Sequence, residues 1–216
     1  MKKTNRYDTS GLVEAQFEPG SRRRVLKNLL KIKSRREMDY VEAIEQLRAL
    51  EELYGIYDAA HRFTAFDVCK IHKLLFGRIY EWAGRYRQVN VGKGDFRFAA
   101  ARHIPALMEE FENGPLKKLT PCRFSSQKEI AKAIAMVHTE LVLIHPFREG
   151  NGRVARILSA LMALQAGLPS LDFSGIKGRK RQEYFAAVRA GMDKNYAPME
   201  KIFNAVIFRT QRIRKG

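Results

Sequence analysis

The sequence has few of the features that mark secreted or membrane proteins. Its 216 residues include only two cysteines, Cys69 and Cys122, which are far apart and lack the spacing of metal ligands. This argues against a disulfide framework and favours a reducing compartment. Apolar runs such as LVLI and ILSALMAL are too short to cross a membrane, and the basic start MKKTNRYDTSG lacks the apolar segment of a secretory signal. We therefore expect a cytoplasmic protein with no membrane partner.

Acidic residues are also scarce, because 23 Asp and Glu stand against 40 Lys and Arg, a formal net charge of +17. An anionic partner is therefore expected. The basic residues concentrate in 21–36, in 177–181 and in the final RTQRIRKG, and each cluster is equally compatible with a solvated face. No helix-turn-helix, zinc-finger or RNA-binding aromatic signature is present, so direct reading of bases is not indicated. Binding of nucleic acid through a basic surface stays open.

Hydrophobic spacing predicts helices along most of the chain. Ser126 and Glu129 form one capping pattern, and Thr64 and Asp67 form another. In the first long segment the apolar residues at three- and four-residue spacing are Tyr40, Ile44, Leu47, Leu50 and Tyr54. The expected helices are 36–59, 64–75, 103–112, 125–144, 152–167, 179–192 and 197–213.

Residues 85–99, RYRQVNVGKGDFRFA, depart from this pattern. Side chains alternate in character from Tyr86 to Val91, and the chain then turns through Gly92 and Gly94 towards Phe96. This predicts a β-hairpin. The fold class that follows is all-α, with a small hairpin, in one domain spanning residues 1–216. The outer edge of the hairpin, at Val91, is expected to accept a further strand.

The stretch HPFREGNGRVAR, residues 145–156, lies between two predicted helices. Gly150 and Gly152 at the start of the second helix let backbone N–H groups face an anion, where the helix dipole adds positive potential. Asn151 adds a side-chain amide, and Arg153 and Arg156 fall on one side of the helix, able to bind phosphate oxygens.

The same stretch carries an acid and a base. Glu149 can hold a hard cation such as Mg²⁺ together with substrate phosphates. His145 has an unperturbed pKa near neutrality and is the natural general base. Phe147 is expected to point into the core and fix the loop. The combination predicts a site for phosphoryl or nucleotidyl transfer.

These residues match at every fixed position the signature of the Fic family, which the chain resembles over roughly residues 25–205, with basic N- and C-terminal extensions. Upstream, LFGRIYEWAGRYRQVNVGKGDFRFA is similar to the segment that leads into the flap hairpin of the family. The resemblance implies a protein adenylyltransferase that moves AMP from ATP to a Ser, Thr or Tyr hydroxyl of a target protein, with Mg²⁺ as cofactor. Gly152, where the kinase-like Doc branch has lysine, agrees with AMP transfer.

The resemblance also implies roles for single residues. His145 would deprotonate the target hydroxyl, and Glu149 would ligate Mg²⁺ at the α- and β-phosphates. It places Gly150, Asn151, Gly152, Arg153 and Arg156 at the phosphates, Lys93 and Gly94 in the flap over the nucleotide, and Gln182 and Tyr184 beside the adenine.

Many Fic proteins carry an inhibitory helix with Ser or Thr, three residues, then Glu and Gly or Asn. Only Ser125 to Glu129 loosely matches, but Ile130 follows, and we interpret Glu129 as a helix cap. The chain therefore resembles the subgroup silenced by a small separate antitoxin that supplies the glutamate. Such members act as bacterial toxins, and some modify subunits of type II topoisomerases.

The main alternative is a catalytically silent, basic interaction module of Fic fold that binds nucleic acid or protein. Rarer Fic chemistries, such as phosphocholine transfer or AMP removal, also stay open. The remaining histidines, His61, His72, His103 and His138, are interpreted as core or surface residues because they lack partners at ligand spacing.

Overall fold

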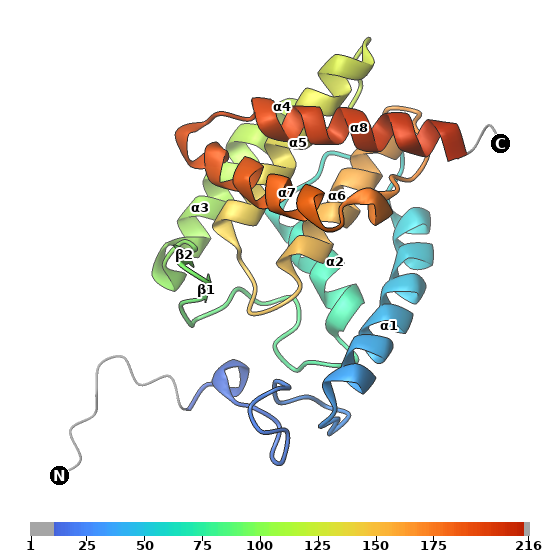
Figure 1. Cartoon of the computed structure of the whole chain (residues 1–216). Coiled ribbons are helices and arrows are strands. Elements are labelled where there is room, and N and C mark those ends of the chain that lie inside the picture. The colour runs from blue at the N-terminus through green and yellow to red at the C-terminus, as the bar shows by residue number, and fades with distance from the viewer. Residues whose placement is uncertain (1–10, 214–216) are drawn as a thin grey trace.

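The computed structural model describes residues 11–213, and two buried helices form its centre (Figure 1). These are α5 (Gln127–Ile144) and α6 (Asn151–Gln165), which pack against each other. The C-terminal α8 (Ala197–Ile213) lies across α5, and α7 (Arg179–Ala190) lies beside α8. On the other side, α2 (Ala65–Phe76) packs on α6, and α1 (Arg35–Ile56) packs on α2.

The remaining helices, strands and turns of the described chain are short. α3 (Ile104–Phe111) packs on α5 and continues through a π turn (Glu112–Leu116) into α4 (Lys117–Leu119). Strands β1 (Gly92–Lys93) and β2 (Phe96–Arg97) pair antiparallel. Short 3₁₀ turns occur at Val13–Ala15, Ala101–His103, Phe173–Gly175 and Gly191–Asp193. The expected class, mostly helical with one small antiparallel hairpin, is confirmed.

Both predicted capping pairs are present. The Ser126 side chain accepts from the backbone N–H of Glu129, and the Glu129 carboxylate accepts from Ser126 in return. Thr64 and Asp67 do the same at the start of α2. An N-terminal cap contributes about 1 kcal/mol to stability. The helix starts are therefore fixed by local hydrogen bonds that the sequence alone displays.

Four of the five apolar residues whose spacing predicted α1 lie outside its buried face, and only Leu50 of the set packs against the core. Tyr40, Ile44, Leu47 and Tyr54 are exposed, and the residues that face the core are Met38, Glu42, Ala49 and Leu53. Both sets repeat every three to four residues, so α1 carries two apolar faces on opposite sides. The spacing of apolar residues identified the helix from its larger apolar face. The face that packs on the core is less apolar, because its position 42 holds a glutamate.

The predicted hairpin is present but shorter than the alternation suggests. Only two residues on each side are paired, and Gly94, with a φ of +61°, forms the turn with Asp95. Residues 86–91 are not a strand, because Arg87 donates its backbone N–H to the carbonyl of Pro146 instead of to a partner strand. Phe98 donates to the carbonyl of Val91, so that carbonyl points into the hairpin.

The described residues contain no helix long and apolar enough to cross a membrane. Cys69 and Cys122 are both free, the first partly buried and the second fully buried. Arg22, Arg23 and Arg24, from the first basic cluster, lie exposed in the turns before α1. The basic start of the chain, residues 1–10, and residues 214–216 of the C-terminal cluster lie outside the described residues.

The two faces of α1 can be separated by a matched pair of substitutions. Leu53, which is 0% exposed, should destabilise the protein by about 2–5 kcal/mol when changed to Ala, because a cavity opens in the core. Leu47→Ala, at a side chain that is 66% exposed, should change the free energy of unfolding by no more than about 0.5 kcal/mol. Denaturant unfolding of both variants measures this, and equal losses would contradict the assignment of the faces.

Candidate active site

The loop between α5 and α6 is held by residues of the 145–156 stretch itself. Asn151 accepts from the backbone N–H of Phe147 at 2.8 Å and donates to its carbonyl at 2.8 Å. Phe147 is fully buried, as expected, and stacks on His72 with ring centroids 3.9 Å apart. The amide of Asn151 is therefore committed to the loop, and only its backbone N–H remains for the anion contact that the sequence assigned to it.

Gly150 is required by the path of the chain. Its φ of +81° lies in the left-handed region, and a Cβ at this position would come within 2.3 Å of the Phe76 ring. Helix α6 begins with the next residue, so the N–H groups of its first turn open beside the loop. Gly152 is not required in this way, since a Cβ there would meet only the end of the Arg156 side chain, at 3.6 Å.

His145 ends α5 with a left-handed backbone, φ 52° and ψ 58°, and turns its ring towards a cavity that it helps to line. Its Nδ1 lies 3.0 Å from the carbonyl of Val142, which fixes the proton on Nδ1 and leaves Nε2 as the free base. The ring of Phe98, which follows β2, stacks on the imidazole with centroids 3.6 Å apart. Burial lowers the pKa of His145 to about 4, so the ring is neutral at pH 7.

Glu149 presents a carboxylate that is only partly withdrawn from solvent. Its Oε1 accepts from the N–H of Gly150 at 3.0 Å and lies 3.7 Å from Arg153. Its backbone carbonyl accepts from Nε2 of His72 at 3.1 Å, because Nδ1 of His72 is already used by the N–H of Gly84. Residues 11–213 contain no group of three or more His, Cys, Asp or Glu that could hold a metal. A cation at Glu149 would therefore need phosphate and water oxygens as its other ligands, which is how Mg²⁺ commonly binds.

The two arginines of the stretch differ in their partners. Arg153 lies 2.8 Å from the carboxylate of Glu42 on α1, a side chain that is 4% exposed and also accepts from the hydroxyl of Tyr80. Arg156 has no hydrogen-bonding or ion-pairing partner among the described residues, and burial lowers its pKa. A half-buried guanidinium without a carboxylate is suited to an anionic ligand.

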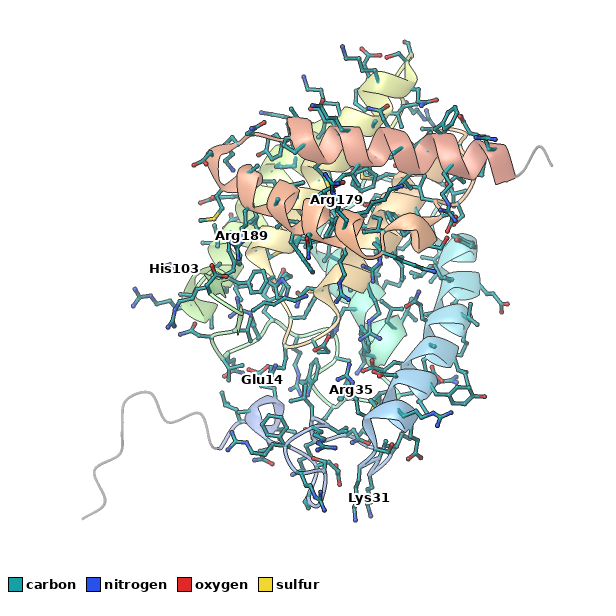
Figure 2. The ribbon with its side chains drawn as sticks, in the orientation of Figure 1. Glu14, Lys31, Arg35, His103, Arg179 and Arg189 are labelled. Atoms are coloured by element: carbon teal, nitrogen blue, oxygen red, sulfur yellow. The ribbon has the colours of Figure 1, made fainter. Side chains whose placement is uncertain are left out.

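The hairpin and α7 close the other side of the cavity. Nζ of Lys93 lies 4.1 Å from the centroid of the Phe185 ring, and Arg189 forms an ion pair with Asp95 at the hairpin turn, at 2.5 Å. Burial lowers the pKa of Lys93, and nearby Arg181 lowers it further. Figure 2 shows Arg189 on α7 above the hairpin. These contacts join two elements that lie almost a hundred residues apart in the sequence.

The resulting cavity has a volume of about 950 Å³, enough for a nucleotide. Seven cationic side chains and one acidic side chain line it, and they are Arg35, Lys93, Arg148, Arg153, Arg156, Arg181, Arg189 and Glu149. Arg35, Arg153 and Arg189 have carboxylate partners in Asp39, Glu42 and Asp95. The remaining positive charge favours a polyanion.

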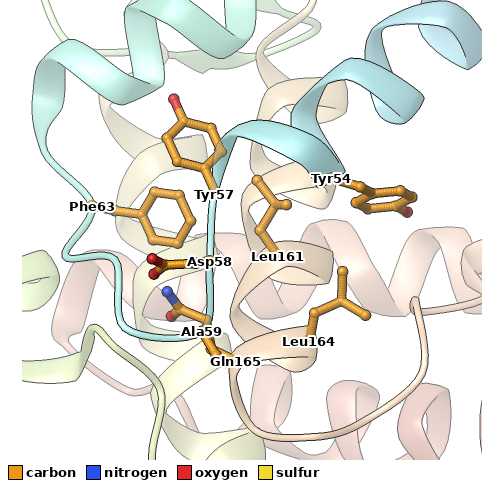
Figure 3. Close-up of a pocket in the computed structure, with 8 residues that line it drawn as sticks. All are labelled: Tyr54, Tyr57, Asp58, Ala59, Phe63, Leu161, Leu164 and Gln165. Atoms are coloured by element: carbon orange, nitrogen blue, oxygen red, sulfur yellow. The ribbon is translucent and has the colours of Figure 1, made fainter.

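A second pocket lies at the far ends of α1 and α6, between Tyr54, Tyr57, Phe63 and Leu161 (Figure 3). Its volume is about 60 Å³, which admits no more than a few atoms. Asp58 is the only charged residue that lines it. Size and charge therefore both favour the large cavity as the functional site.

Comparison with known proteins agrees with this geometry. Residues 62–163 match the model of the Fic/DOC family. The chain is 32% identical over 162 residues to "Probable protein adenylyltransferase y4lH" of Sinorhizobium fredii, covering 72% of this chain and 79% of that protein. The chain belongs to the Fic/DOC family.

Two other Fic proteins extend the comparison. "Protein adenylyltransferase VbhT" of Bartonella schoenbuchensis is 32% identical over 80% of this chain, but the match spans only 34% of VbhT. The crystal structure of an N-terminal Fic domain of an effector protein from Bartonella quintana, with bound ADP, superposes with a TM-score of 0.70 at 27% identity. That match covers 89% of this chain and 94% of the other.

The Fic cavity contains most, but not all, of the residues predicted for it. His145, Glu149, Gly150, Asn151, Gly152, Arg153, Arg156, Lys93 and Tyr184 line it. Two predicted residues do not. Gly94 lies at the exposed hairpin turn, and Gln182 lies on the exposed side of α7. The face of α7 that borders the cavity consists of Arg181, Tyr184, Phe185, Val188 and Arg189.

Tyr184 lines the cavity, and its hydroxyl points away from the cavity towards buried His138. That hydroxyl lies 2.8 Å from Nε2 of His138, and Nδ1 of His138 lies 3.0 Å from the hydroxyl of Ser159. Because Ser159 donates to the carbonyl of Ala155, Nδ1 of His138 is the donor and Tyr184 donates to Nε2. His138 is therefore a core histidine, as expected, with the added task of fixing a cavity residue.

Sequence reasoning missed several residues that hold the site. Glu14 accepts from the backbone N–H groups of Gln88 and Val89, at 2.6 and 3.1 Å, where the N-terminal segment meets the loops (Figure 2). The ring of Phe98 stacks on the imidazole of His145, and the side chain of Arg87 donates to the backbone carbonyl of His145. The spacing of Arg181 and Phe185 around Tyr184 could have indicated the face of α7, but no local pattern pointed to Glu14 or Arg87.

The lowered pKa of His145 predicts a specific pH dependence. The unfolded chain binds this proton near pH 6.5 and the folded chain only near pH 4, so stability is lost as the pH falls through that window. His145→Gln should therefore remove about 2 kcal/mol of the loss of stability between pH 7 and pH 5. Denaturant unfolding of the wild type and of His145→Gln at both pH values measures this. Because buried His72 and His138 are present in both proteins, the difference between them reports on His145 alone. A half-protonation point near pH 6.5 in an NMR titration of the folded protein would contradict the assignment.

Proposed function

We propose that this Fic protein is an adenylyltransferase that moves AMP from ATP to a hydroxyl of a target protein. The observation that carries the proposal is the neutral, oriented imidazole of His145 in a cavity that also contains the unpartnered Arg156. Relatives named protein adenylyltransferase and a Fic domain crystallised with ADP support it. The match with VbhT covers about a third of that protein, so its activity is transferred here only as a proposal.

In the proposed reaction, Nε2 of His145 takes the proton of the target hydroxyl as its oxygen bonds to the α-phosphorus of ATP. The bond from the α-phosphorus to the bridging oxygen breaks, and pyrophosphate leaves with the electron pair. Arg156 and the N–H groups at the start of α6 stabilise the charge on the phosphates, and Arg153 is fixed by Glu42 to do the same. Mg²⁺, when bound, supplies charge neutralisation at the phosphates. Its protein ligand would be Glu149, in keeping with the single carboxylate there.

The hairpin is proposed to hold the target. In its ladder, Lys93 and Phe96 face each other across the turn, and Phe98 donates to Val91, so the groups of Gly92 between them point outward. A target segment would therefore pair along Gly92, and Val91, named from the sequence, is the wrong contact. This brings a hydroxyl towards His145 through main-chain bonds.

Regulation by a separate antitoxin is also proposed. Glu129 caps its own helix and is exposed, so it is not an internal inhibitor. The outer face of α1, formed by Tyr40, Ile44, Leu47 and Tyr54, is an apolar surface on which a small protein could pack, and Arg35 at the start of α1 lines the cavity. Such a partner would place a glutamate against Arg156. A DNA-associated target such as a type II topoisomerase subunit suits the basic chain, and nucleic acid itself remains a second proposed partner.

The catalytic proposal is tested by two substitutions in the stretch. His145→Ala should lower the rate of AMP transfer by about 10²–10⁴-fold while ATP binding is retained, because a general base is lost. Glu149→Gln keeps the shape but removes the charge, so the Mg²⁺ requirement should rise. Labelled ATP and a bacterial lysate provide the assay, and the exposed His103→Ala is the matched control. Unchanged transfer by folded His145→Ala protein would show that another group is the base.

The regulatory proposal predicts that the isolated chain is active. Its expression in bacteria should slow growth, and expression of His145→Ala should not. Growth curves of the two strains measure this. The acid most able to act from within is Glu42, since it pairs with Arg153. If the isolated chain transfers AMP only after Glu42→Gln, inhibition is internal and the antitoxin proposal fails.

A further inference from the structure

Arg87 carries a charged side chain in the interior of the protein, where it is 2% exposed. Its guanidinium donates three hydrogen bonds, all to backbone carbonyls. Nε donates to His145 at 2.8 Å, Nη1 to Val89 at 2.7 Å and Nη2 to Ala99 at 2.6 Å. The backbone N–H of Arg87 donates to the carbonyl of Pro146, at 2.8 Å. One side chain thus contacts three separate parts of the chain.

Those three parts are the components of the proposed active site. Val89 lies on the arm that enters the hairpin, and Ala99 lies on the arm that leaves it. His145 carries the proposed base. The planar fork of a guanidinium suits such a junction because its donors diverge at fixed angles, which an ammonium group cannot reproduce.

The charge of Arg87 has no carboxylate partner among residues 11–213. Glu14 is the acidic group whose charge raises the pKa of Arg87, but its Oε1 accepts from the N–H groups of Gln88 and Val89 rather than from Arg87. Burial lowers the pKa of Arg87 to about 10, so the side chain remains charged at neutral pH. Burying a cation against neutral carbonyls is costly, and a packed apolar side chain could fill the same space at lower cost. The arrangement therefore serves geometry more than stability.

We infer that Arg87 is a positioning residue that locks the backbone of His145 to both arms of the hairpin, so that base and target-binding strand move as one unit. The inference rests on the proposed function for its role in transfer. The structure supplies two fixed points for the imidazole. Arg87 holds the carbonyl of the left-handed residue that carries the ring, and Phe98, next to Ala99 on the leaving arm, stacks on the ring itself. Loss of Arg87 frees both points.

The test compares Arg87→Lys and Arg87→Met with Arg85→Met. Lysine keeps the charge but not the fork, and methionine keeps the apolar stem without donors. Arg85 lies two residues away and is exposed, and its side chain donates to the carbonyl of Glu81, so Arg85→Met controls for loss of a nearby cation. Three measurements are made on folded protein. They are the NMR shifts of the His145 ring protons, the affinity for the ATP analogue AMPPNP, and transfer from labelled ATP to proteins of a bacterial lysate.

In the wild type, stacking on Phe98 should move the His145 ring protons upfield. Arg87→Lys and Arg87→Met should lose that shift and lower the maximal transfer rate by about 10²-fold, the effect of a misplacement of about 1 Å. AMPPNP affinity should change by less than about threefold, and Arg85→Met should match the wild type throughout. If either Arg87 variant folds and retains the upfield shift, Arg87 does not position the base, and the inference is overturned.

The transfer assay and the ring shifts together distinguish a failure of this inference from a failure of the proposed function. A wild-type protein that transfers no AMP would sink the adenylyltransferase proposal, but the ring shifts would still decide whether Arg87 positions His145. A displaced ring with an unchanged transfer rate would overturn the role in catalysis. Should Arg87→Met fail to fold, Arg87→Lys carries the test, because it retains the charge and the stem.

Discussion

The site depends on one constraint, the reversal of the chain between two buried helices within residues 145–150. Polar backbone in such a loop must find partners, since an unpaired buried group costs about 1–3 kcal/mol. Asn151 meets this need by bonding both the N–H and the carbonyl of Phe147. Left-handed residues at His145 and Gly150 make the turn short enough. The same geometry that closes the loop exposes the base, the carboxylate and the first turn of α6 to one cavity.

Charge in that cavity is arranged by burial more than by pairing. Burial lowers the pKa of His145 to about 4 and also lowers the pKa values of Arg156 and Lys93. Neutral histidine can accept a proton, and cations deprived of water gain most from an anionic ligand. Pairing is used where rigidity matters, as at Glu42 and Arg153. The cavity is therefore prepared for a polyanion on one side and for proton transfer on the other.

The sequence predicted what is decided locally. The caps at Ser126 and Thr64, the helix that begins beside Gly150 and the helical fold follow from patterns within a few residues. It did not predict which face of α1 is buried, because Glu42 is a core residue by virtue of Tyr80 and of Arg153, the second over a hundred positions later. Tertiary contacts also decided the direction of Gln182 and the shortness of the hairpin. The role of Arg87 depends on three carbonyls from different segments, which no local pattern can reveal.

The elements around the cavity differ in how firmly they are held, and the difference suits a site that must admit a protein. α5 and α6 are buried along most of their length, so they open only with the whole core. The hairpin has two residues in each strand, and its turn is tied to α7 by an exposed ion pair between Asp95 and Arg189, a contact that solvent screens and weakens. It can therefore detach from α7 at low cost. The two arms of the hairpin, which the buried Arg87 holds at Val89 and Ala99, cannot follow. Movement is therefore confined to the turn, and the position of His145 is preserved.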